Sequence, residues 1–187
     1  ITETGDVRAV NETTINAPSI WGTSLQIIDL VEEGTIVATG DFLIQFETAE
    51  LQTEYDLRSD RLASLRADLE KLRAQQKLTM DNLENNRRLA QYSLEQARLQ
   101  LEIMKYESDA KLDEARLSLE QAKIDLARIE KELESQKIIH RSQIIQLNSS
   151  INEAENRLES VRENIRKCTV TAPAGGLIVY YDVGGWR

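Results

Sequence analysis

A long stretch without glycine or proline constrains the fold of this chain more than any other feature. All eight glycines and both prolines lie outside the segment from Asp41 to Ala172. Both residues interrupt helices and mark turns, so a stretch of this length without either of them favours long helices. The segment is rich in Leu, Ala, Glu, Gln, Lys and Arg, which are all strong helix formers. The sequence therefore predicts a helical middle part between two flanks that contain the turns.

The middle part repeats core-type residues at alternating steps of three and four, the spacing of a coiled-coil seam. In its second arm the series is Leu112, Ala115, Leu119, Ala122, Leu126, Ile129, Leu133, Gln136 and His140, then Ile144, Leu147, Ile151, Ala154, Leu158, Val161 and Ile165. The extra four-residue step after His140 is a stutter, which locally unwinds a supercoil. In the first arm the series is Leu62, Leu65, Leu69, Leu72, Gln76, Thr79 and Leu83, followed after a change of phase by Ala90, Leu94, Ala97, Leu101 and Met104.

A second change of phase, between Met104 and Leu112, indicates where the chain turns back. Ser108 and Asp109 lie there, and both residue types are good helix N-caps. Folding at this point gives two arms of about 58 residues, or roughly 87 Å each at 1.5 Å per residue. One unbroken helix would instead separate the two flanks by more than ~150 Å. We therefore expect an antiparallel two-helix hairpin over 48–167, with its turn near 106–111.

The hairpin also predicts which residues face each other, because the numbers of facing residues should add to about 216. Gln76 then lies opposite His140, and Thr79 lies opposite Gln136. All four are polar, whereas most of the seam is aliphatic. Polar core residues can fix the register of a coiled coil at a cost in stability. The sequence therefore predicts a polar seam layer of Gln76, Thr79, Gln136 and His140.

The two flanks are typical of short β-strands with tight turns. The strand candidates are 27–31, 35–37, 42–46 and 177–181, and the glycines lie between or beside them. Ile15-Asn16-Ala17-Pro18 and Val170-Thr171-Ala172-Pro173 also repeat a local pattern, as two halves of one domain would. We expect residues 1–47 to form the first half, with 1–10 as a remnant β-barrel strand, and 168–187 to form a truncated second half. Trp21 and Trp186 are expected to pack in or near this β-domain, and the chain as a whole is expected to be a fragment.

Together these features resemble the membrane fusion protein family, also called periplasmic adaptors of the hemolysin-D type. The matching segments are 15–22, 31–37, 39–43 and 170–179. In that family a lipoyl-like (biotinyl-lipoyl) β-domain is split by an inserted α-helical hairpin. The resemblance therefore implies an α+β fold, with a long antiparallel coiled-coil hairpin between the two halves of such a domain.

The resemblance also implies a role, partners and a location. Such adaptors are not enzymes; they bridge an inner-membrane transporter of the ABC, RND or MFS type to an outer-membrane channel in efflux and secretion complexes. They assemble as rings, commonly hexamers, in the periplasm, and an anchor segment, here outside the chain, holds them to the inner membrane. The residues implied to dock the channel are those of the hairpin tip, Lys105, Tyr106, Glu107, Ser108, Asp109, Ala110 and Lys111. TolC-type channels are met by a tip motif of Arg, Leu and Ser at fixed helical spacing, which is not found there. Four residues after Arg98, where the motif has Leu, this chain has Glu102.

Little in the sequence indicates catalysis, a cofactor or nucleic-acid binding. The net charge of −9 gives no basic surface for nucleic acid. Glu47-Thr48-Ala49-Glu50 stands where a carrier domain would have its modified lysine, so we expect no lipoyl or biotinyl cofactor. His140 is the only histidine, which makes a metal site weak, and Cys168 is expected to be a buried, inert thiol. Two alternatives to an adaptor remain: a coiled-coil scaffold or tether unrelated to export, and a carrier domain of an acyl or carboxyl transfer enzyme.

Overall fold

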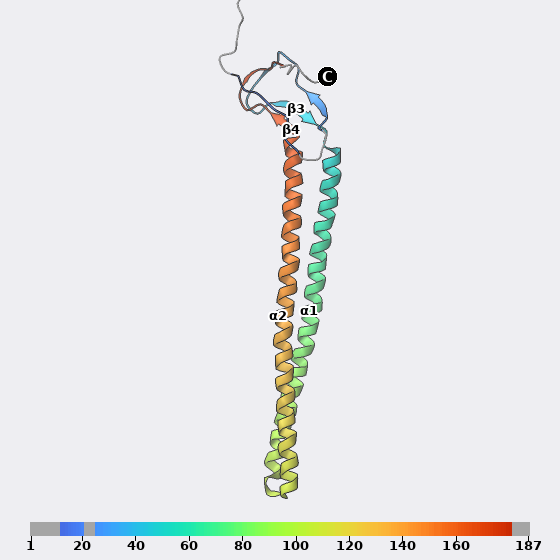
Figure 1. Ribbon diagram of the computed structural model, residues 1–187, viewed down its shortest axis with the longest axis vertical. Coiled ribbons are helices and arrows are strands. Elements are labelled where there is room, and N and C mark those ends of the chain that lie inside the picture. Colours follow the sequence, from blue (N-terminus) through green and yellow to red (C-terminus); the bar gives the residue numbers. More distant parts are fainter. Residues whose placement is uncertain (1–11, 21–24, 181–187) are drawn as a thin grey trace, which may run out of the picture. The chain divides into compact units, whose positions relative to one another are not determined.

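The computed structural model describes residues 12–20 and 25–180, and everything below concerns that part of the chain. The expected strand at 1–10, Trp21 and Trp186 lie outside it. Three short strands come first: β1 (Ile27–Leu30), β2 (Ile36–Val37) and β3 (Phe42–Phe46). They are followed by helix α1 (Ala49–Ile103), a 3-10 turn (Met104–Tyr106) and helix α2 (Asp109–Lys167), and the chain continues into β4 (Thr169–Thr171) and β5 (Gly176–Leu177). The predicted α+β class, with two long helices and a small β-part, is confirmed (Figure 1).

The chain divides into two compact units, which are described separately. One, the β-unit, comprises residues up to Asp56 together with those from Glu159 onwards. The other, the hairpin unit, is Leu57–Leu158. Both helices run through the boundary, so the first turns of α1 and the last turns of α2 belong to the β-unit.

Strands from before and after the helices pair in the same sheets of the β-unit. The three-stranded sheet has the order β1-β3-β4, with β3 antiparallel to both neighbours. Phe42 of β3 lies opposite Thr171 of β4, although the whole hairpin separates them in sequence. The two-stranded sheet joins β2 to β5 in the same way, with Ile36 opposite Leu177. Since each sheet needs a strand from both flanks, the flanks are two parts of one folded unit.

Two glycine turns connect the flanks further. Gly34 and Gly40 have φ angles of 83° and 93°, a left-handed conformation that glycine adopts without a steric cost. The Gly34 N–H donates to the carbonyl of Ile178 at 2.9 Å, and the Gly40 N–H donates to that of Ala172 at 2.8 Å. Each turn before the helices therefore binds the backbone that follows them.

Two small apolar clusters form the core of the β-unit. The first contains Ile20, Phe46, Leu51 and Cys168, and the second contains Val37, Leu43 and Ala172. The Cys168 side chain has no exposed surface, and burial raises the pKa of its thiol. A buried, protonated thiol is a poor nucleophile, so Cys168 acts as a small core residue.

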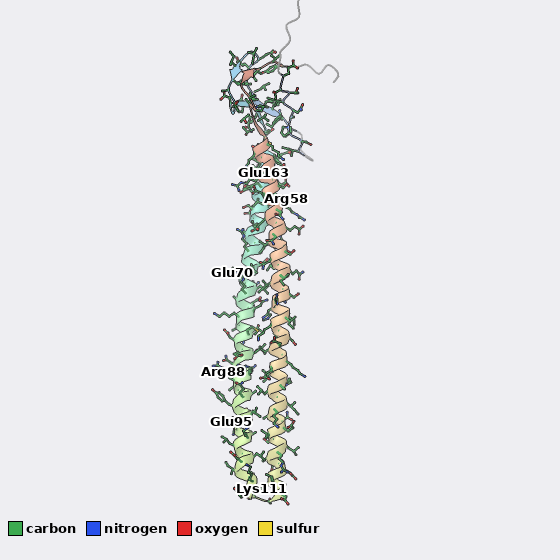
Figure 2. All side chains as sticks on the ribbon, turned by 90° about the vertical axis from the view of Figure 1, so that its left-hand side faces the viewer. Arg58, Glu70, Arg88, Glu95, Lys111 and Glu163 are labelled. Atoms are coloured by element: carbon green, nitrogen blue, oxygen red, sulfur yellow. The ribbon has the colours of Figure 1, made fainter. Side chains whose placement is uncertain are left out.

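In the hairpin unit, α1 and α2 pack side by side along one seam (Figure 1). Every seam position expected in α2 is buried or half-buried, and so is every one in α1 except Thr79. Thr79 is exposed and donates its hydroxyl to the carbonyl of Gln75 in its own helix, while Met80 is half-buried instead. Charged residues such as Glu70, Arg88 and Glu95 line the outside of α1 (Figure 2).

Candidate docking site at the hairpin tip

The tip is a short turn that needs no glycine. Helix α1 ends at Ile103 and passes into the 3-10 turn, after which Glu107 is extended and donates its N–H to the carbonyl of Met104 at 3.1 Å. The Ser108 carbonyl then accepts hydrogen bonds from the backbone N–H groups of Lys111 and Leu112 at 3.0 and 3.1 Å, which starts α2. The chain therefore reverses direction over a few residues, with three backbone hydrogen bonds formed within the turn.

The lysines at the tip are paired with carboxylates three or four residues away in the sequence. The Lys111 ammonium is 3.1 Å from the Glu107 carboxylate, and that of Lys105 is 3.8 Å from Glu102. Asp109 lies in the first turn of α2, where the positive end of the helix dipole favours a carboxylate. These contacts are solvent-exposed and contribute little stability. They nevertheless leave the tip without a strong net field, so its recognition depends on shape and apolar contact.

All seven residues expected at the tip, from Lys105 to Lys111, are exposed. Tyr106 is the most prominent, with 95% of its surface accessible to solvent, and Ile103 beside it is also exposed. Tyrosine combines a large rigid ring with a hydroxyl and is enriched in protein interfaces. The geometry thus offers one aromatic anchor surrounded by paired charges.

Three of the four residues expected in the polar layer lie at the seam. The Gln76 side chain, only 8% exposed, donates to the backbone carbonyl of His140 at 3.2 Å and to the side-chain oxygen of Gln143 at 3.1 Å. Gln136 and His140 are half-buried. Thr79 is not part of the layer because it faces solvent. Gln143, which sequence reasoning missed, supplies the side-chain partner instead.

A charged residue occupies the seam a little further towards the tip. Arg87 is half-buried between Leu83 and Ala90, and its guanidinium contacts the Glu84 carboxylate at 2.5 Å. This hydrogen bond lowers the pKa of Glu84, and the positive charges of Arg87, Arg88 and Lys137 act in the same direction. Arg87 lies at seam spacing, four residues after Leu83 and three before Ala90, but the sequence series placed a change of phase there and passed over it.

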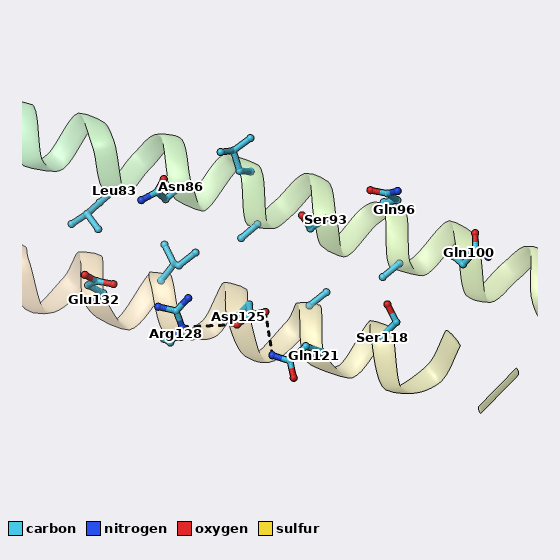
Figure 3. A pocket seen from close by; sticks show the side chains of 15 residues that line it. Leu83, Asn86, Ser93, Gln96, Gln100, Ser118, Gln121, Asp125, Arg128 and Glu132 are labelled. Carbon is cyan, nitrogen blue, oxygen red and sulfur yellow. Dashed lines mark hydrogen bonds and ion pairs between the residues drawn. The ribbon is translucent and has the colours of Figure 1, made fainter. Parts of the chain in front are cut away.

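Nearer the tip, a shallow groove of about 820 Å³ lies along the two helices. Figure 3 shows Ser93, Gln96 and Gln100 of α1 and Ser118 and Gln121 of α2 among the residues that line it. Alanines form part of its floor, including Ala97 and Ala122. The lining combines amides, hydroxyls and alanines with aliphatic side chains and with the charged residues Asp125, Arg128 and Glu132.

Sequence reasoning also missed a set of exposed apolar residues on the outer faces of the helices near the tip. They are Tyr92, Leu99 and Ile103 on α1, and Leu117 and Ile124 on α2. Leu89 is exposed too, but it lines the groove. Large apolar residues repeated on an outer helix face are unusual in an isolated hairpin. Their seven-residue spacing, Tyr92 to Leu99 and Leu117 to Ile124, was the signal that could have revealed them.

Within residues 12–20 and 25–180, no three potential metal ligands come together. No helix in this range is long and apolar enough to cross a membrane.

The fold is therefore a small β-unit, built from both flanks of the chain, with a two-helix hairpin inserted between them. No family model and no curated protein matches the chain. Several solved structures are similar to it. The periplasmic adaptor protein EmrA is similar at 15% identity with a TM-score of 0.41. MacA from Actinobacillus actinomycetemcomitans is similar at 22% identity with a TM-score of 0.48. The soluble domain of LipC, a membrane fusion protein of a type I secretion system, is similar at 18% identity with a TM-score of 0.46.

The similar regions cover most of this chain: 81% for EmrA, 87% for MacA and 92% for LipC. In the other direction, the chain spans 61% of EmrA, 41% of MacA and 93% of LipC. Two of these structures are described as a periplasmic adaptor and a membrane fusion protein, the family that the sequence motifs resemble.

Proposed function

We propose that this chain is the lipoyl-like domain and α-hairpin of a periplasmic adaptor in a trans-envelope efflux or secretion complex. The adaptor joins an inner-membrane transporter to an outer-membrane channel and catalyses no reaction. The hairpin acts as a spacer, and its tip, Lys105 to Lys111, docks the channel. Copies associate into a ring, and a membrane anchor outside this chain holds them at the inner membrane.

One observation carries the docking role: Tyr106 is almost completely exposed at the end of a hairpin whose neighbouring charges are paired with each other. A lone exposed aromatic side chain has no stabilising function in the free protein. It gains contacts only when a partner covers it. The fold supports the adaptor role because the strands that flank the hairpin close into one unit, as the motif resemblance requires.

The test uses the full-length protein in the cell envelope that produces it. A photo-crosslinking amino acid at Tyr106 is expected to capture an outer-membrane protein, whereas the same group at Lys71, exposed on α1 outside the tip, should not. Tyr106→Ser should reduce export of the cargo about tenfold or more, as expected for loss of an interface anchor. Export that continues normally in Tyr106→Ser, with equal capture from both positions, would show that the tip is not the docking site.

A further inference from the structure

A second shallow groove, the mid-hairpin groove, lies between α1 and α2 about halfway along the hairpin. Its volume is about 490 Å³, and it adjoins the polar layer, since Gln76 and His140 are among its lining residues. Met80, Ile144 and Ile145 supply its apolar side chains. Met80 and Ile144 are half-buried, whereas 59% of Ile145 is accessible to solvent. The groove therefore has an apolar floor that a ligand can reach.

All the charged residues that line this groove are cations. They are Arg73 and Lys77 of α1 and Lys137 and Arg141 of α2. No carboxylate is among the described lining residues, although acidic residues outnumber basic ones by 32 to 23 in the chain. On each helix the two cations stand four residues apart, a spacing at which like charges repel and destabilise the helix. Such an arrangement is relieved when an anion binds between them.

The cations of the two helices lie at the same level of the hairpin. Residues in contact across the seam have numbers that add to 216 for Gln76 and His140 and to 219 for Gln76 and Gln143. The numbers of Lys77 and Arg141 add to 218, so these two residues are level with each other. One ligand in the groove can therefore contact a cation from each helix.

These two level cations have no partner in the protein. Arg73 and Lys137 each contact an exposed carboxylate of their own helix, at 2.8 and 3.2 Å. Within the described part of the chain, the side chains of Lys77 and Arg141 form no ion pair and no hydrogen bond. The imidazole of His140 is not hydrogen-bonded there either, because only its backbone carbonyl accepts a bond from Gln76. Three donors of the lining are thus available to an anion.

Carboxylates limit the groove at its ends. Glu70 stands three residues before the first lining residue of α1, and Glu84 stands four residues after the last one. Glu134 stands three residues before the first lining residue of α2. The lining of α2 spans residues 137–145, which is about 12 Å along the helix. A longer acidic helix, or an anionic membrane surface, would meet these carboxylates, so the groove fits a short ligand.

We propose that the mid-hairpin groove binds one small amphipathic anion, with a carboxylate, sulfonate or phosphate head on an aliphatic chain. The head lies between the Lys77 ammonium and the Arg141 guanidinium, which forms paired, charge-assisted hydrogen bonds with such groups. The chain lies over Met80 and Ile145, and the flexible thioether of methionine adapts to chains of different shape. This site is separate from the tip and goes beyond the proposed docking function.

The test is calorimetric titration of the full-length protein with decanoate, at concentrations below those at which it forms micelles. Decanoate should bind. Acetate, which has the same head without the chain, should bind at least tenfold more weakly, and so should decyltrimethylammonium, which has the same chain with a positive head. Equal binding of acetate would show that the apolar floor is not used, and equal binding of the cation would show that the charges are not. Either result overturns the proposal, as does a wild-type protein that does not bind decanoate.

Substitutions locate the binding. Lys77→Gln/Arg141→Gln should weaken decanoate binding at least tenfold, because it removes two charge-assisted hydrogen bonds. Lys71→Gln/Lys131→Gln is the matched control, since it removes the same charge from exposed lysines of the same two helices outside the groove. All four side chains are exposed, so the variants should fold normally, which helical circular dichroism checks. Equal decanoate binding by the two double variants would overturn the proposal.

Two further measurements separate this site from a membrane surface and from the tip. Vesicles of anionic phosphatidylglycerol should not bind to the groove. Vesicle binding that is lost in Lys77→Gln/Arg141→Gln would assign the groove to a membrane surface and overturn the proposal. Tyr106→Ser should bind decanoate as tightly as the wild type, so failure of the tip to dock and failure of the groove to bind are distinguishable.

Discussion

The hairpin unit has two halves that use the same repeat differently. In the open half, residues 57–82 and 134–158, the seam is filled by large side chains, and Leu62, Leu65, Leu69 and Ile151 form a buried cluster. In the tip half, residues 83–133, the buried positions include three alanines, Ala97, Ala115 and Ala122. Their leucine neighbours, such as Leu94 and Leu126, are only half-buried.

This difference concerns how much each half of the coiled coil contributes to the free energy of folding. Alanine buries far less apolar area than leucine, so each turn of the tip half contributes less to folding. The open half also has an ion pair between the helices, Arg66 with Glu155 at 2.7 Å. Both halves also carry exposed large apolar residues, such as Leu78 and Ile138 in the open half and Tyr92 and Leu117 in the tip half. The comparison therefore indicates that the open half contributes more of the stability of the hairpin.

The largest expected effect comes from shortening one leucine in each half. Leu69→Ala should lower the free energy of unfolding by about 2–4 kcal/mol, because Leu69 belongs to the buried cluster. Leu126→Ala should cost only about 1–2 kcal/mol, because this side chain is half-buried and less of its contact area is lost. Urea unfolding followed by helical circular dichroism measures both.

Leu57→Ala is the control, since Leu57 is exposed and its truncation should change stability by less than about 0.5 kcal/mol. Equal losses for Leu69→Ala and Leu126→Ala would remove the proposed difference between the halves.

A smaller effect is expected at the polar layer, which lies in the open half near its border with the tip half. Gln76→Leu removes two hydrogen bonds, to the backbone of His140 and to Gln143. Gln143 is exposed and can bond to water, and a leucine would add buried apolar area, so the loss is offset. We expect the free energy of unfolding to stay the same or rise by about 1 kcal/mol.

The same urea experiment measures this, with Gln143→Leu as the control that removes only the exposed partner. A loss of more than about 2 kcal/mol in Gln76→Leu would mean that the layer contributes to holding the two helices together, and does not only fix their register.

The fold class could be predicted from the sequence because glycine, proline and heptad spacing are local signals. The wrong placement of Thr79 at the seam has a different cause, because the correct position depends on the facing helix. The series in α2 has its extra four-residue step at His140 to Ile144, and the structure shows a matching step in α1, Leu72 to Gln76 to Met80. Antiparallel helices stay in contact only if both change phase at the same level. Neither arm alone reveals this, because Thr79 and Met80 are both acceptable seam residues.

The exposed apolar residues on the outer helix faces near the tip were partly predictable. Tyr92 and Leu99 each lie two positions before a seam residue that the sequence identifies, so their outward position could have been inferred, whereas their degree of exposure comes from the structure. The tip residues, by contrast, follow from the change of phase alone. Their docking role stays a prediction.

The smallest expected effect is a pH dependence at the start of the tip half, where Arg87 occupies the seam and is held by Glu84. The bond to Arg87 keeps the pKa of Glu84 below its ordinary value of 4.5. A carboxyl group whose pKa is lowered by folding contributes stability above its unfolded pKa, and this contribution is lost as the pH falls through the folded pKa. Glu84→Gln should therefore have a lower Tm than the wild type at pH 6, and the difference should shrink as the pH falls below about 4.5.

The control for this experiment is the same substitution made in Arg87→Met, where Glu84 has lost its main partner. Because the cause is the contact between these two side chains, the pH-dependent difference should then be much smaller. If it is just as large without the guanidinium, the lowered pKa of Glu84 must come from Arg88 and Lys137. In that case the remaining favourable charge near Arg87 would be the Glu130 carboxylate of α2.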